Sequence, residues 1–304
     1  QEAAKLCREV MGDDVHISIS SEIGSMGLIE RENATILNAA LYQVAEAFTE
    51  GFAKSLAKEG ITNADVYLSQ NDGTLMTMEY ARKYPILTIA CGPTNSIRGA
   101  GYLSRQKDAI VVDVGGTTTD LGVIQTGFPR ESGVAVTIGG VRTNFRMPDV
   151  ISIGLGGGSI VRSLPDGTVT VGPDSVGFKI TEEALCFGGK ICTATDIAVR
   201  LGMANLGDPA KVAQLDEEFA VKAMETIQAM VEDSLDAMKV SSDDADVILV
   251  GGGSIIVPDN LKGASIVRKP EQGGVANAIG AAISKVSGNY EQLVDYNEIP
   301  RETA

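Results

Sequence analysis

Clusters of glycine constrain the fold of this chain more than any other sequence feature. The sequence has 35 glycines in 304 residues, well above the average share of about 7%. They gather in six short groups, at positions 115–116, 139–140, 154–158, 188–189, 251–253 and 273–274. Two of these groups follow apolar, β-branched runs, where a backbone without side chains can approach another group closely. Because the groups contain little serine or proline, we interpret them as tight turns rather than linkers.

The charge balance excludes several classes of protein. The chain has 25 Lys and Arg against 40 Asp and Glu, a net charge of −15, which repels nucleic acids. No apolar run reaches the roughly 20 residues of a membrane helix, and the start of the sequence lacks the blocks of a signal peptide. Four scattered cysteines favour reduced thiols. We therefore expect a cytoplasmic protein with neither a nucleic acid nor a membrane as partner.

A single histidine, His16, limits the available chemistry. A zinc site built from several histidines is excluded, and a Ser-His-Asp triad would have to use this residue. The β-branched run around it predicts a strand near a surface. Acid–base catalysis by this chain must therefore rely on carboxylates.

The alternation of helical and strand patterns predicts an α/β protein. Apolar spacings of three and four predict helices over 33–59, 95–104, 216–239 and 275–287. Apolar runs predict strands over 65–70, 86–91, 134–138 and 247–250, a hairpin over 110–124, and mixed loop and strand over 149–175. Asp216 is expected to cap the third helix, and Pro258 to begin a further helix. A change of pattern near residue 106 predicts two sub-domains.

The strongest chemical signal is the segment DVGGTTTD at 113–120. Asp113 ends a buried strand, and the glycine turn after it exposes backbone N–H groups beside threonine hydroxyls. Such turns form concave sites for phosphate, and a neighbouring carboxylate can hold hydrated Mg²⁺ or orient an attacking group. Asp120, on the opposing strand, can hydrogen-bond the threonines. The alternative is a plain hairpin with a glycine turn, which needs neither an aspartate nor three threonines.

A second signal, GGGS at 251–254, follows the strand 247–250. Its glycines would let a flat ring lie against the backbone. Alone it is equally consistent with an ordinary turn, but together with 113–120 it becomes specific. The sequence contains no P-loop and no complete Gly-x-Gly-x-x-Gly, since Ser159 replaces the last glycine of the nearest match, at 154–159.

The paired motifs resemble the phosphate and adenosine motifs of the actin, sugar kinase and heat-shock ATPase superfamily. Within it, the chain resembles the A subunit of the hydantoinase/oxoprolinase family. The segments that carry this resemblance are 70–73 (QNDG), Gly92-Pro93, 113–120, 154–159 and Thr195-Asp196. It covers nearly the whole chain and implies an actin-like ATPase (ribonuclease H-like) fold with two sub-domains around a nucleotide cleft. Residues 1–106 would be the remainder of the first sub-domain, 107–285 the second, and 286–304 a C-terminal tail.

The resemblance also implies an activity, which is the ATP- and Mg²⁺-dependent ring opening of a cyclic amide such as 5-oxoproline or a hydantoin. Phosphorylation of the carbonyl oxygen would make the ring carbon electrophilic, so that water can open a stable amide. Most such proteins work with a B-type subunit. The same motifs also suit a ketone carboxylase subunit, a nucleotide-dependent switch such as a reactivating or chaperone-like ATPase, and a small-molecule kinase.

Carried over by position, the resemblance assigns roles to individual residues. Asp113 would bind Mg²⁺ or position water, and Asp120, Asp149 and Asp196 are the other catalytic candidates. The candidates for binding the nucleotide are Gly115, Gly116, Thr117, Thr118, Gly157, Gly158, Ser159, Gly251, Gly252, Gly253 and Ser254. For Asp196, an N-cap of a helix over 197–204 is an equally good interpretation.

Two features depart from the family pattern. Thr94, Asn95 and Ser96 follow Gly-Pro where the family has small residues, and no earlier Asp-x-Gly-Gly-Thr element precedes residue 113. Since the sequence also does not begin with Met, we expect the larger C-terminal part of a longer protein. A chain with half of the phosphate cradle is expected to bind ATP weakly.

Overall fold

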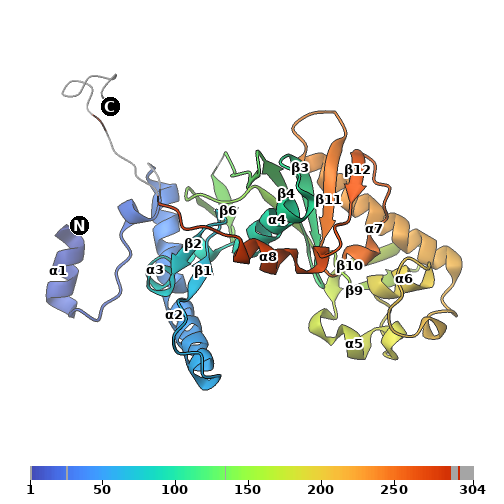
Figure 1. Ribbon diagram of the computed structural model, residues 1–304, viewed down its shortest axis with the longest axis horizontal. Coiled ribbons are helices and arrows are strands. Elements are labelled where there is room, and N and C mark those ends of the chain that lie inside the picture. Colours follow the sequence, from blue (N-terminus) through green and yellow to red (C-terminus); the bar gives the residue numbers. More distant parts are fainter. Residues whose placement is uncertain (1, 25–26, 134, 289–293, 295–304) are drawn as a thin grey trace.

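The computed structural model describes residues 2–24, 27–133, 135–288 and 294 (Figure 1). The helices are α1 (Glu2–Met11), α2 (Ile29–Lys58), α3 (Met78–Lys83), α4 (Cys91–Ser104), α5 (Ile180–Glu183), α6 (Ala194–Arg200), α7 (Glu217–Met238) and α8 (Ala276–Ala282). The strands are β1 (Tyr67–Ser69), β2 (Leu75–Thr77), β3 (Ala109–Val114), β4 (Thr119–Gln125), β5 (Phe128–Pro129), β6 (Val136–Ile138), β7 (Val141–Thr143), β8 (Val150–Ile153), β9 (Ser159–Ser163), β10 (Val169–Ser175), β11 (Ala245–Val250) and β12 (Ala264–Arg268). Within these residues, no helix is both long and apolar enough to cross a membrane.

A six-stranded mixed sheet forms the centre of the molecule. Its order is β12-β11-β3-β4-β5, with β8 also paired to β4. β11 runs parallel to both β12 and β3, whereas β4 is antiparallel to β3 and β8. The α/β fold class predicted from the sequence is confirmed, since helices and a mixed sheet alternate along the chain.

The alternation of side chains along β3 builds a core on each face of this sheet. Ile110, Val112 and Val114 point into the larger core, which includes buried side chains of α7. Ala109 and Val111 point to the opposite face, where α4 and α8 cover the sheet. Figure 1 shows α4 and α8 side by side on that face. The sheet is therefore buried on both faces, which suits the nearly continuous apolar composition of β3 and β11.

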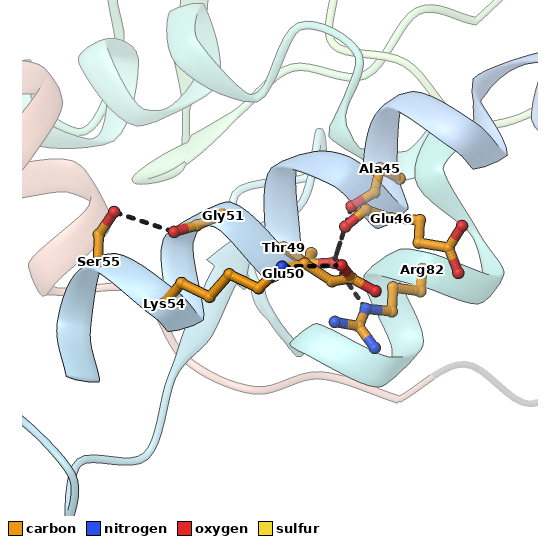
Figure 2. A network of polar contacts seen from close by, with 8 residues as sticks. All are labelled: Ala45, Glu46, Thr49, Glu50, Gly51, Lys54, Ser55 and Arg82. Carbon is orange, nitrogen blue, oxygen red and sulfur yellow. Dashed lines mark hydrogen bonds and ion pairs between the residues drawn. The ribbon is translucent and has the colours of Figure 1, made fainter. Parts of the chain in front are cut away.

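The N-terminal part of the chain packs around α2 and the turn at 85–88. A small core there contains Ala34, Ile86, Phe145 and Met147. A polar network also ties α3 to α2 (Figure 2), since Arg82 Nε donates to Thr49 Oγ1 over 2.6 Å. The Thr49 hydroxyl in turn donates to the carbonyl of Ala45, at 2.8 Å. These contacts hold α2 against the segment that leads into α4.

Most predicted elements are confirmed, with shifted ends. The first and third predicted helices are α2 and α7, and the Asp216 carboxylate caps α7 by accepting from the Phe219 N–H at 2.8 Å. The hairpin is β3–β4. β1 lies within its predicted range, and β11 begins two residues before its predicted range. Of the strand predicted over 134–138, residue 134 lies outside the described residues and the rest contains β6. All four cysteines are free thiols.

Two predictions near proline residues are wrong. The sequence predicts a strand over 86–91, but Pro85–Thr88 is a 3₁₀ turn. The Ile86 N–H donates to the Asn38 side chain at 3.2 Å rather than to a neighbouring strand. No helix begins at Pro258. Instead, a 3₁₀ turn at Ser254–Ile256 is followed by buried Val257, whose carbonyl accepts from Lys269 at 2.9 Å.

Two further predictions fail because of contacts with distant segments. The last helix, predicted over 275–287, ends at Ala282, since the Lys285 carbonyl accepts from the Leu75 N–H at 3.0 Å and Val286 bridges Leu75. The run around His16 is not a strand. The His16 ring instead stacks on the Tyr42 ring, with centroids 3.2 Å apart. The boundary near residue 106 stays a prediction, and the tail 286–304 falls largely outside the described residues.

Candidate functional site

Three glycine loops that are far apart in the sequence meet at the end of β3. The Gly253 N–H donates to the Val114 carbonyl at 2.8 Å. The N–H groups of Gly157 and Gly158 donate to the carbonyls of Gly115 and Gly116, at 3.0 and 2.7 Å. The loops at 113–118, 154–158 and 251–253 thus form one hydrogen-bonded unit, which joins the two motifs that the sequence pairs.

The approach of these backbones is too close for side chains. A Cβ on Gly253 would lie 2.3 Å from the Gly115 carbonyl oxygen, and a Cβ on Gly156 would lie 2.5 Å from the Thr117 nitrogen. Gly251 has φ +88°, and its Cβ would lie 2.2 Å from the Val114 carbonyl oxygen and 2.4 Å from Asp113 Oδ1. Glycine is required at these positions because the loops pack directly on one another.

The turn at 116–118 presents open hydrogen-bond donors. The Gly115 N–H closes the turn on the Thr118 carbonyl at 2.8 Å. Gly116, Thr117 and Thr118 are exposed, and their N–H groups donate to no acceptor within the described part of the chain. Successive free N–H groups of this kind form a concave anion site. The arrangement suits a phosphate.

Two carboxylates face each other beside this turn. Asp113 and Asp120 are direct cross-strand partners in the β3–β4 pair. Burial raises the pKa of Asp113, a contact with the Ser96 hydroxyl lowers it, and the charge of Asp120 raises it further. Burial also raises the pKa of Asp120, while Ser152 lowers it. Either carboxyl group therefore holds a proton more readily than an exposed aspartate does.

The structure places Asp149 away from the glycine loops. It precedes β8, four residues before Ile153, which pairs with Thr119, so about 13 Å of strand separates it from the turn. Its carboxylate pairs with Arg130, with Nη2 2.7 Å from Oδ2. The same guanidinium donates to the Met238 carbonyl at 3.2 Å. A catalytic role for Asp149 stays a prediction.

Asp196 is fully buried at the start of α6. Its carboxylate accepts from the N–H groups of Leu185, Cys186 and Thr193, at 3.2, 2.7 and 2.8 Å, and from the Thr193 hydroxyl at 2.8 Å. Thr193 is the N-cap residue and Asp196 completes a capping box. These contacts give Asp196 a complete structural environment, whereas its catalytic role is untested.

Thr195, next to Asp196, and the predicted residues Ser159 and Ser254 lie at the junction of the glycine loops. The Thr195 hydroxyl donates to the Gly157 carbonyl at 2.9 Å and ties α6 to the glycine loops. The Ser159 hydroxyl is buried and accepts from the Gly156 N–H at 2.8 Å, while Ser254 begins the turn after Gly253. The sequence analysis names Thr195 beside Asp196 and Ser96 after Gly-Pro, but it gives neither residue a role, because the sequence does not show which partner a hydroxyl will find.

The residues present fit Mg²⁺ and a nucleotide. Gly252 is exposed, and no atom lies within 4 Å of the place that a Cβ would take, so the backbone there is open to a ring. Within the described ranges, no group of three or more His, Cys, Asp or Glu residues could hold a metal by itself. Mg²⁺ commonly uses only one or two carboxylates together with water and phosphate oxygens. Asp113, partly buried beside the open turn, matches that pattern.

Comparison with known proteins gives a consistent result. A model of the hydantoinase/oxoprolinase family matches residues 31–245. The chain is 27% identical, over 189 residues, to the acetophenone carboxylase gamma subunit of Aromatoleum aromaticum (strain DSM 19018 / LMG 30748 / EbN1), covering 61% of this chain and 25% of that subunit.

Two solved structures share the fold. The ATP-dependent caprolactamase of Pseudomonas jessenii has a TM-score of 0.75 at 21% identity, over 94% of this chain and 46% of that one. Nucleotide-free acetone carboxylase has a TM-score of 0.69 at 21% identity, over 93% of this chain and 44% of that one. The chain thus spans a quarter of the carboxylase gamma subunit and less than half of either solved chain.

Proposed function

This chain belongs to the hydantoinase/oxoprolinase family, and on that premise we propose that it contributes to ATP-dependent hydrolysis of a cyclic amide such as 5-oxoproline or a hydantoin. The observation that carries the proposal is the junction of three glycine loops beside Asp113. The fold shared with an ATP-dependent caprolactamase supports it, because caprolactam is itself a cyclic amide.

Each part of the junction has a role in this proposal. The free N–H groups at 116–118 hold phosphate oxygens, and the backbone at 251–254 lies against the adenosine. Bound ATP would supply the phosphoryl group that activates the carbonyl of the substrate. Asp113 would hold Mg²⁺ or orient water, and Asp120, whose pKa burial also raises, would accept a proton from that water.

The proposal also includes an architecture and a partner. Residues 107–285 form the second actin-like sub-domain, and residues 1–106 form the remainder of the first. The chain acts as the A-type subunit beside a B-type subunit. The match to a protein described as the gamma subunit of acetophenone carboxylase supports a multi-subunit enzyme.

One observation favours a second candidate, a subunit of an ATP-dependent ketone carboxylase. The acetophenone carboxylase gamma subunit is related in sequence, at 27% identity. A ketone and a cyclic amide share a carbonyl oxygen that phosphorylation can activate. The loops described above would serve either reaction, and only the substrate site would differ.

Phosphate release from ATP tests both candidates. The protein is assayed with its B-type subunit and Mg²⁺, with 5-oxoproline, hydantoin, or acetophenone plus bicarbonate. We expect phosphate release when a cyclic amide is the only carbonyl substrate added. Asp113→Asn in the same complex should release none. Turnover that requires a ketone and bicarbonate would favour the carboxylase. Turnover that responds only to a protein client would contradict both and favour a nucleotide-dependent switch.

A further inference from the structure

A cavity of about 650 Å³ lies at the opposite end of the β3–β4 hairpin from the glycine loops. Ile124, which pairs with Ala109, lines this cavity, whereas the open turn at 116–118 follows Val114. Five residues of strand, about 17 Å, therefore separate the cavity from the candidate nucleotide site. Its volume is in the range of sites that bind small organic molecules.

Three cationic side chains line this cavity. They are Arg98 of α4, and Arg105 and Lys107 of the loop that leads into β3. Among the described residues, none of the three side chains has an ion pair or a hydrogen bond. Elsewhere arginines do find carboxylates, as Arg130 does with Asp149 at 2.7 Å. In a chain with a net charge of −15, unpaired positive charges gathered around one cavity favour a negatively charged ligand.

Arg98 is held beside the cavity at an energetic cost. Its Nε is buried with no hydrogen-bond acceptor in the part of the chain that the structure describes, and its guanidinium carbon lies 5.9 Å from the centre of the Phe128 ring. Burial lowers the pKa of Arg98, while the charge of Asp72 raises it. The Asp72 carboxylate accepts from the N–H and the hydroxyl of Thr74, at 2.8 and 2.6 Å. An anion in the cavity would give the guanidinium the charge partner that it lacks.

The backbone of Arg105 is also unfavourable for its residue type. Arg105 follows α4 with φ +58° and ψ +20°, a left-handed conformation that favours glycine at the end of a helix. The Gly127 N–H donates to the Lys107 carbonyl at 2.8 Å and holds this loop against the turn between β4 and β5. The adjacent Asp108 carboxylate accepts from the Thr126 N–H at 2.9 Å. A cationic side chain is thus retained where glycine would fit better, and such strain gathers at functional sites.

The same cavity has an apolar part. Leu103, Ile124 and Ile283 contribute aliphatic side chains, and the exposed ring of Tyr102 adds an aromatic surface. A bare inorganic ion would leave these side chains without contact, whereas an organic anion would contact them through its carbon skeleton. The lining therefore favours an organic anion.

We propose that this cavity is a second ligand site, in which Arg98, Arg105 and Lys107 bind a small organic anion with at least two negative charges. Phosphate esters and polycarboxylic acids share this chemistry, because guanidinium groups pair with the oxygens of either through parallel hydrogen bonds. The inference is independent of the proposed function, since it requires neither ATP nor Mg²⁺ at the glycine loops.

Calorimetry in EDTA tests the inference with two probes, phenyl phosphate and citrate. The probe that wild type binds more tightly identifies the anionic group that the site prefers. Arg98→Gln and Arg105→Gly should each weaken that binding by about 10-fold, the effect of losing one hydrogen bond to a charged group. Lys58→Gln is the matched control and should change nothing, because Lys58 is an exposed cation at the end of α2, outside the cavity.

Arg105→Gly also separates binding from folding. Its Tm should not fall, because glycine adopts the left-handed conformation without strain, so a lower affinity would come from the lost side chain. If affinity and Tm fell together in this variant, the arginine would have a structural role and the inference would be wrong.

Three further results would overturn the inference. The first is that neither probe binds at millimolar concentration. The second is that binding survives in both Arg98→Gln and Arg105→Gly, which would place the probe elsewhere, such as at the turn 116–118, or that it weakens equally in Lys58→Gln. The third is that polyglutamate binds while both small probes fail, which would assign the cavity to an acidic segment of a protein partner.

Discussion

At the scale of single residues, two neighbouring glycines in the loop 251–253 differ in the space around them. Gly253 has φ −83°, which alanine also adopts, but its Cβ would lie 2.3 Å from the Gly115 carbonyl oxygen. Gly252 has no atom within 4 Å of that position. A side chain at Gly253 would therefore disturb packing within the protein, whereas a side chain at Gly252 would occupy only the space left for a ligand.

We expect Gly253→Ala to lower the free energy of unfolding by about 1–3 kcal/mol, the usual cost of overpacking. Gly252→Ala should leave it unchanged and instead weaken ATP binding, because its methyl group occupies the open side of the loop. Urea unfolding followed by circular dichroism measures the first effect, since the sequence has no tryptophan. Equal stability of the two variants would show that the loops do not pack as described.

The facing carboxylates predict an unusual dependence of stability on pH. Burial raises the pKa of Asp113 in the folded protein, so its contribution to stability is present below the unfolded pKa of about 3.9 and is lost as pH rises through the folded value. Asp113→Asn should therefore raise Tm at pH 8 and change it little near pH 4.

Asp233→Asn, at an exposed position of α7, controls for the change in net charge. Its Tm difference from wild type should be small at both pH values. A stabilisation by Asp113→Asn that was the same at pH 4 and pH 8 would mean that ionisation of the buried carboxyl group does not cause it.

At the scale of secondary structure elements, the start of α6 depends on one buried carboxylate. Asp196 accepts four hydrogen bonds, three of them from backbone N–H groups. Asp196→Asn would place an NH₂ group against these donors. We expect a loss of about 3 kcal/mol in unfolding free energy, since a hydrogen bond to a charged group contributes about 1.5–3 kcal/mol.

The exposed turn at Asp208 offers a matched comparison. There the carboxylate accepts from a single backbone N–H, that of Ala210, at 3.0 Å, so Asp208→Asn should cost far less in chemical denaturation. If Asp196→Asn kept wild-type stability but lost ATP hydrolysis, Asp196 would be a catalytic residue instead of a structural one.

The elements also show which sequence patterns were sufficient to predict a helix or a strand. α2 and α7 have long apolar periods, and β3–β4 has a β-branched run with a glycine turn, so local interactions already favour them. The strand prediction for the apolar run at 86–91 is wrong, because the donor at Ile86 meets Asn38 of α2 instead of a strand. That partner lies 48 residues away, beyond the reach of any local pattern.

At the scale of the whole molecule, the extent of the chain bears on nucleotide affinity. It spans 46% of the caprolactamase chain and 44% of the acetone carboxylase chain. The family resemblance leads us to expect a second Asp-x-Gly-Gly-Thr element, and this sequence has none before residue 113. We expect the 304-residue chain to bind Mg-ATP more weakly than micromolar, and the same chain extended by such an element to bind more tightly.

Isothermal calorimetry of both forms measures this difference. Micromolar affinity of the 304-residue chain would contradict the prediction and would mean that the loops at 113–118 and 251–253 suffice. Failure of both forms to bind would assign the glycine loops a structural role, or would place the missing groups on a partner subunit.

Sequence patterns were enough for the two motifs, the fold class and the family, because each depends on short segments whose residue types already specify a turn or a strand. They also singled out Asp113 and the glycines at 115–116 and 251–253. Which polar side chains accompany these residues depended on packing. Thr195 comes from α6, and its hydroxyl finds the Gly157 carbonyl only after the fold has brought that helix to the glycine loops. The same packing placed Asp149 on Arg130 and buried Asp196 at the start of α6, since contacts between elements, and not the local pattern, settle where a carboxylate finds its hydrogen bonds.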